Sequence, residues 1–92
     1  MKKTEFVNAI LKIKKAKSIR GIVYSYRRID GNDLIFVREG KTKEEKIDLD
    51  ELFEFYKSNE EYTNKNARKY MSLIVLSPSA AILNKLSNET ID

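Results

Sequence analysis

The chain has 92 residues, enough for one domain with a modest core, and its hydrophobic fraction of 41% is too high for a disordered protein. The absence of cysteine and histidine excludes disulfides, Cys/His zinc sites and catalytic triads that contain histidine. Residues 1–28 hold nine Lys and Arg against one Glu, whereas residues 29–62 are acidic, and this asymmetry predicts a basic face directed toward a polyanion.

The first predicted element is a helix over residues 4–17. Phe6 and Ile10 belong to an apolar stripe with helical spacing, and Thr4 is the expected N-cap. A lysine cluster falls in the last turns, where cations favour the helix dipole and where they can also contact phosphates. The cluster consists of Lys12, Lys14, Lys15 and Lys17.

Three strands are expected next, over residues 20–29, 34–39 and 45–49. β-Branched and aromatic residues dominate the first two of them, as is typical of strands. Asp-Gly-Asn at 30–32 and Gly40 mark the tight turns between the strands. These features predict a three-stranded antiparallel β-meander.

Strict alternation along the first strand predicts two faces of different character. One face carries Ile22, Tyr24, Tyr26 and Arg28, and the other carries Val23, Ser25, Arg27 and Ile29. Tyrosine beside arginine is a combination that nucleic-acid-binding sheets use for stacking and phosphate contacts. The alternative is that helices pack on the Tyr face, in which case the rings belong to the core.

The C-terminal half predicts helices over residues 50–58, 63–71 and from Pro78 to about 86. Asp48 or Asp50 is the expected cap of the first helix, and Thr63 that of the second. Ser77 before Pro78 marks the start of the last one. Residues 72–76 fit either a buried strand or a helix, and residues 87–92 are expected to fray. The predicted fold class is therefore α+β, a single domain over residues 1–92 with the C-terminal helices packed on one sheet face.

The helices over 50–58 and 63–71 also have the order of a helix-turn-helix. The second of them carries Lys65 and Arg68, which suit contacts to phosphates and base edges. The connection between the two helices fits that motif only loosely, and a solvated polar helix face accounts for the same residues.

Two other function classes stay open. The acidic, aromatic stretch 48–62 could be the contact surface of an adaptor or inhibitor, provided that two or more of its rings (Phe53, Phe55, Tyr56) are exposed. A more remote alternative is a metal-dependent nuclease, in which Asp30 and Glu39 hold Mg²⁺ and Lys41 assists the attacking water.

The leading hypothesis is a small, non-enzymatic nucleic-acid-binding or regulatory protein of the cytoplasm, with DNA favoured over RNA. No cofactor, metal or membrane is expected, and a homodimer stays open because an apolar sheet edge or helix face could be left over. The residues predicted to contact nucleic acid are Lys12, Lys14, Lys15, Lys17, Arg20, Arg27, Arg28, Lys65 and Arg68.

Overall fold

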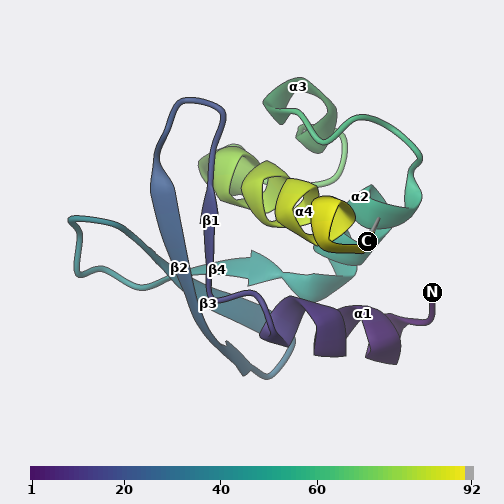
Figure 1. Ribbon diagram of the computed structural model, residues 1–92, viewed down its shortest axis with the longest axis horizontal. Coiled ribbons are helices and arrows are strands. Elements are labelled where there is room, and N and C mark those ends of the chain that lie inside the picture. The colour runs from purple at the N-terminus through teal and green to yellow at the C-terminus, as the bar shows by residue number, and fades with distance from the viewer. Residues whose placement is uncertain (91–92) are drawn as a thin grey trace.

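The computed structural model describes the backbone of residues 1–90 and the side chains of residues 1–88, and it confirms the α+β class. One antiparallel sheet has the strand order β1-β2-β3-β4. In the view of Figure 1, α4 lies in front of the sheet, with α3 toward the top of the picture and α1 toward the bottom. The elements are α1 (Lys3–Leu11), β1 (Lys15–Lys17), β2 (Val23–Asp30), β3 (Asp33–Arg38), β4 (Glu45–Asp48), α2 (Leu49–Lys57), α3 (Asn64–Ala67), the 3₁₀ helix η1 (Leu73–Val75) and α4 (Leu76–Thr90).

The sheet has four strands, one more than predicted. The predicted N-terminal helix over 4–17 is wrong in its second half, which contains the additional strand. α1 ends at Leu11, and residues 15–17 form the edge strand β1. The backbone N–H of Tyr26 donates to the carbonyl of Lys14 (2.8 Å), and Ala16 is buried opposite Tyr24. Pairing with β2 therefore satisfies backbone groups that a longer helix would leave open at the sheet edge.

The two predicted faces of the first strand are also wrong from Arg27 onward. Tyr26 is paired with Phe36 and Arg28 with Ile35, so Arg27 is an extra residue in a β-bulge. The bulge shifts the alternation by one residue. Arg28 therefore lies on the side opposite to Tyr24 and Tyr26, and the half-buried Ile29 packs against the core.

The core lies between one sheet face and the helices. Tyr24 and Tyr26 are 5% and 4% exposed, so the alternative in which these rings are core residues is confirmed. The hydroxyl of Tyr26 donates to the carbonyl of Pro78 (2.7 Å), which ties β2 to α4. The other fully buried side chains of this layer include Phe6, Ile10, Leu34, Phe36, Leu52, Phe55, Ile82 and Leu83.

Two predicted helix caps are confirmed, whereas the predicted cap Thr4 is wrong because α1 already starts at Lys3. A carboxylate oxygen of Asp48 accepts from the N–H groups of Asp50 (2.8 Å) and Glu51 (3.1 Å) at the start of α2. The Thr63 hydroxyl accepts from the N–H of Asn66 (3.2 Å) at the start of α3.

The predicted boundaries of the C-terminal helices need three corrections. The helix over 63–71 is limited to α3, four residues long. Residues 73–75 form η1, which leads directly into α4, so this helix starts at Leu76 and Ser77 is not its cap. Pro78 fits the first turn of α4, because N–H groups at the start of a helix have no acceptor within it and the lack of an N–H in proline therefore costs no hydrogen bond. α4 continues to Thr90, beyond the predicted end near residue 86. The expected fraying of residues 87–92 stays a prediction, and residues 91–92 lie outside the described chain.

Candidate nucleic-acid interface

The strand register places several predicted contact residues on the side of the sheet that is turned away from the helices. Lys15 and Lys17 flank the buried Ala16, so they point to this side, where they are paired with Ser25 and Val23. We call this side the open sheet face. It is formed by Lys15, Lys17, Val23, Ser25, Arg28, Ile35, Val37 and Lys46.

The centre of the open sheet face is apolar but hardly exposed. Ile35 and Val37 are only 8% and 5% exposed, although they do not belong to the core cluster under the helices. Arg28 and Lys46 stand on either side of Ile35 in the register, and the aliphatic stems of such long side chains can cover apolar neighbours. The face therefore consists of a narrow aliphatic strip with cations along its borders.

Two cations of the open sheet face are neutralised within the protein. The Arg28 guanidinium donates to both carboxylate oxygens of Glu44 (2.7 and 3.0 Å), and this pairing raises the pKa of Arg28 and lowers that of Glu44. The ammonium of Lys46 lies 3.9 Å from Asp33. Both groups are therefore less available to an external anion.

A second set of cations has no ion pair within the part of the chain that the structure describes. These residues lie on β1, on the connections before and after it, and on the bulge in β2. The bulge is adjacent because the residue before Arg27 is hydrogen-bonded to Lys14. Six unpaired positive charges on adjacent backbone segments favour a polyanion. This set, called the β1 cation cluster below, consists of Lys12, Lys14, Lys15, Lys17, Arg20 and Arg27.

The structure does not bring Lys65 and Arg68 into this cluster. Lys65 lies on α3 and Arg68 directly follows it, and α3 packs on α4, on the helical side of the sheet (Figure 1). α3 is also too short for a recognition helix, which must present several side chains along a groove. Lys65 and Arg68 are therefore suitable controls for charge effects that are unrelated to the sheet.

Lys46 was missed in the sequence, although a signal for it existed. It directly precedes Ile47, the buried residue of the last strand, and alternation from Ile47 places it on the open face. No comparable signal in the sequence marks residues 18–20, 62–64 and 77–84, which line a pocket beside Arg20, because these segments are far apart in the chain.

The geometry does not favour the two other function classes. Phe55 is fully buried, and Phe53 and Tyr56 pack on Phe6 with ring centroids 5.0 Å from it, so the stretch 48–62 does not present free aromatic anchors.

The carboxylates of the nuclease alternative lie at opposite ends of β3. Asp30 is paired with Asp33, whereas Glu39 follows Arg38, and strand rise separates the two ends by about 20 Å. One metal ion cannot bind both side chains. No group of three or more acidic residues suited to a metal ion occurs among the described residues.

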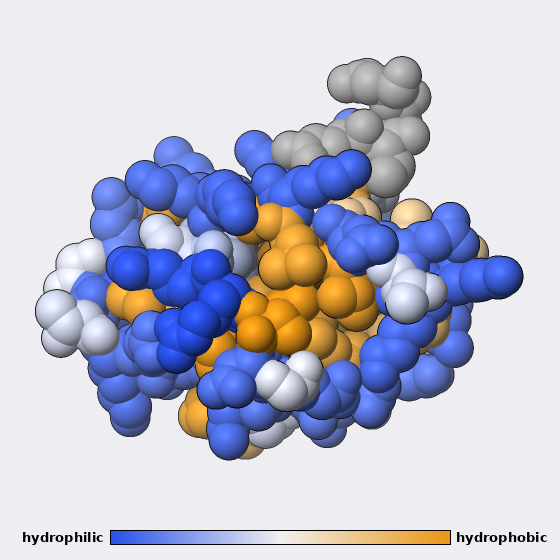
Figure 2. Space-filling view, turned by 90° about the horizontal axis from the view of Figure 1, so that it is seen from below, coloured by the Kyte–Doolittle hydropathy of each residue, from blue (hydrophilic) through white to orange (hydrophobic). Residues whose placement is uncertain are grey.

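An apolar area lies on the side of the molecule that α1 forms, with hydrophilic residues around it (Figure 2). α1 carries Leu11, which is 42% exposed, and Val7, which is half-buried one turn earlier. Exposed apolar areas can support self-association, so the homodimer that the sequence left open stays a prediction. None of the helices in the described chain has the length and apolar character that a membrane span requires.

No protein-family model, curated protein or solved structure matches this chain.

Proposed function

We propose that this protein binds nucleic acid, DNA in the first place, through the β1 cation cluster and the adjoining open sheet face. The observation that carries the proposal is that Lys12, Lys14, Lys15, Lys17, Arg20 and Arg27 lie on adjacent backbone segments, exposed and without an ion pair in the described chain. Cations in this arrangement neutralise successive phosphates of one backbone.

The mode of binding follows from what the open sheet face lacks. Both tyrosines of β2 are buried, and the centre of the face is aliphatic, so none of its described side chains is an aromatic ring on which a base could stack. Binding is therefore driven by phosphate contacts, tolerates different sequences and weakens steeply with added salt.

The test is a fluorescence-anisotropy titration of a single-stranded DNA of about 16 nucleotides between about 50 and about 200 mM salt. If four cations are engaged, the slope of log K against log salt is about −3. The variant Lys15→Gln/Lys17→Gln loses about 1.4 units of this slope and about tenfold in affinity at low salt. Duplex DNA and RNA of the same length, titrated in parallel, rank the possible targets.

The matched control is Lys65→Gln/Arg68→Gln, which removes the same charge from the helical side of the sheet. We expect this control to bind nearly as the unchanged protein does. The absence of binding at low salt, or an equal loss in the two double variants, would overturn the proposal.

A further inference from the structure

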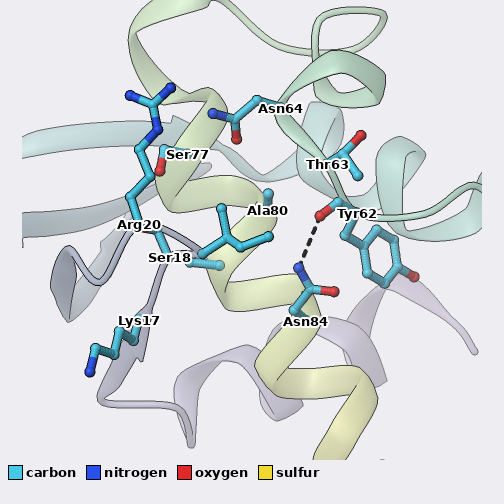
Figure 3. Close-up of a pocket in the computed structure, with 11 residues that line it drawn as sticks. Lys17, Ser18, Arg20, Tyr62, Thr63, Asn64, Ser77, Ala80 and Asn84 are labelled. Atoms are coloured by element: carbon cyan, nitrogen blue, oxygen red, sulfur yellow. Dashed lines mark hydrogen bonds between the residues drawn. The ribbon is translucent and has the colours of Figure 1, made fainter.

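A pocket of about 240 Å³ opens beside the β1 cation cluster (Figure 3). Three separate segments build it: the end of β1 with the connection to β2, residues 62–64 at the start of α3, and α4. A hydrogen bond from the Asn84 side chain to the carbonyl of Tyr62 (2.9 Å) holds the turn against the helix. Its walls are therefore fixed by contacts between distant parts of the chain.

One end of the pocket is rich in hydrogen-bond donors. The guanidinium of Arg20, the amide of Asn64 and the hydroxyl of Ser77 all lie toward this end (Figure 3). Asp and Glu are absent from the described residues that line the pocket, and Arg20 has no ion pair in the described chain. A cation accompanied by neutral donors matches the oxygens of a phosphate group.

The pocket also has an apolar part, formed by Ile19, Ala80 and Ala81, and it is larger than a phosphate requires. α4 contributes both alanines beside the polar Ser77 and Asn84, and the small alanine side chains leave the space open. The volume lies just below the roughly 300–1,000 Å³ of pockets for drug-sized ligands. This size suits a single nucleoside that is attached to the phosphate.

The rim of the pocket carries an apolar side chain that is fully exposed to solvent. Ile19, at the tip of the connection between β1 and β2, is fully exposed and lines the pocket. Gly21 has a φ of +87°, a backbone conformation that other residues rarely adopt, and it shapes this tight connection. A planar base between Ile19 and the alanines would remove apolar surface from water on both of its faces.

The charges around the pocket define the orientation of such a ligand. Glu60 and Glu61 lie in an open groove beyond Tyr62, and Glu60 is paired with Lys69 at 2.5 Å. The potential is therefore positive near Arg20 and more negative toward Glu61. A phosphate is favoured at the Arg20 end, with the nucleoside directed toward the groove.

We propose that this pocket binds a nucleoside phosphomonoester, either as a free mononucleotide or as the 5′-terminal nucleotide of a strand. The second form rests on the proposed function, and Lys17 connects the two sites because it lies on the open sheet face and also lines the pocket. A strand that follows β1 would then place its phosphorylated end in the pocket.

The experiment compares two DNA strands that differ only in a 5′-phosphate or a 5′-hydroxyl, with anisotropy as the readout. Thymidine 5′-monophosphate is titrated separately while the backbone amide signals of the pocket residues are followed by NMR. We expect about tenfold tighter binding of the phosphorylated strand, and shifts confined to residues that line the pocket.

Three pocket variants and one control locate the effect. Arg20→Gln removes the cation and Ala80→Leu fills the apolar part, and each abolishes the preference for the 5′-phosphate. Lys41→Gln removes the same charge in the distant connection between β3 and β4 and retains the preference. Because Ala80 is buried and its variant can unfold, Ser77→Ala is the second test of the pocket, and it reduces the preference without filling the space.

The outcomes separate the two proposals. Equal binding of the two strands, together with no amide shift from the mononucleotide, overturns the pocket proposal and leaves the proposed function intact. Binding of the mononucleotide without any strand binding supports the pocket in its free-nucleotide form and refutes the proposed function. Equal amide shifts from inorganic phosphate and from the mononucleotide at equal concentration refute the nucleoside part of the proposal.

Discussion

The two faces of the sheet are made from the same strands, yet their side chains lie in opposite environments. On the inner face, Tyr24, Tyr26 and Phe36 are packed under the helices and lose almost all contact with water. On the open face, other residues of this sheet, such as Lys17 on β1 and Arg28 on β2, remain in solvent. Basic and aromatic residues that are mixed in the sequence are therefore separated in space.

This separation changes what the mixed composition of β2 means. Aromatic residues interleaved with arginine suggested one surface that could stack on bases and bind phosphates. Because successive side chains of a strand point to opposite sides, the rings stabilise the fold and the cations face the solvent. A composition signal in a strand therefore supports a binding surface only after the register has been established.

The largest effect is expected from the inner face. Phe36→Ala leaves a cavity between β3 and the helices and lowers the free energy of unfolding by about 3–5 kcal/mol. Urea denaturation followed by circular dichroism measures it, and Phe36→Leu, which keeps most of the volume, is the milder comparison. Arg27→Gln, on the bulge, leaves the urea midpoint unchanged. A similar loss in both variants would contradict the division between the two faces.

A smaller effect is expected from the hydroxyl of Tyr26. Tyr26→Phe removes the hydroxyl that donates to the carbonyl of Pro78 in addition to its bond within α4, which costs about 0.5–1.5 kcal/mol at neutral pH. Ser25→Ala, at the adjacent position of β2 on the open face, is the control and has little effect. Urea titrations near neutral pH measure the difference.

The same variant tests the burial of Tyr26 through the pH dependence of stability. Burial, with a smaller contribution from Tyr24, raises the pKa of Tyr26 well above its usual value near 10. The unfolded chain therefore loses the Tyr26 proton first. The contribution of Tyr26 to stability is complete below about pH 10 and falls by about 1.4 kcal/mol per pH unit above it.

Unfolding measured at about pH 8 and about pH 11 should thus show a gap between the unchanged protein and Tyr26→Phe that narrows at the higher pH. Common losses from other groups cancel in this comparison. A gap that stays constant would mean that the Tyr26 hydroxyl is accessible to solvent in the folded protein.

On the open face, the prediction concerns binding rather than stability. Glu44→Gln removes the bidentate ion pair of Arg28. DNA affinity therefore rises a few-fold, and the slope of log K against log salt steepens by about 0.7. Glu51→Gln on α2 makes the same change of net charge and serves as the control. If the two variants gain equally, Arg28 does not face the bound strand.

The smallest effect is expected at Lys46. Its ammonium is 3.9 Å from Asp33 and well exposed, so Lys46→Gln changes the free energy of unfolding by less than about 0.5 kcal/mol. The urea midpoint measures this. A clear loss of stability would show that its stem is needed to cover Ile35, and Lys46→Met, which keeps the stem without the charge, would then restore the midpoint.

The sequence predicts those features of the fold that depend on local chemistry. The capping roles of Asp48 and Thr63 follow from the side chains themselves. β1 was missed because a short lysine-rich segment is extended only when it is paired with β2, and the residues of the segment itself do not show this pairing. The register shift at Arg27 was missed for the same reason, since a bulge depends on how two strands align.

The candidate interface was predictable in its composition and not in its geometry. The excess of Lys and Arg before residue 29 is visible in the sequence, and it supplies the whole β1 cation cluster. Which residues share a surface depends on contacts between elements. The pairing of β3 with β4 adds Lys46 to the open face, whereas the packing of α3 on α4 separates Lys65 and Arg68 from the cluster.

The bulge at Arg27 also makes the length of β2 adjustable. Since the extra residue opposes nothing on β3, deleting it would join Tyr26 and Arg28 into a regular ladder without moving Tyr26, Ile29 or any other core residue from its partner. A chain shortened at this position should fold with the same interior and one exposed charge fewer. At this point of the sheet, the outer surface can gain or lose a residue independently of the core beneath it.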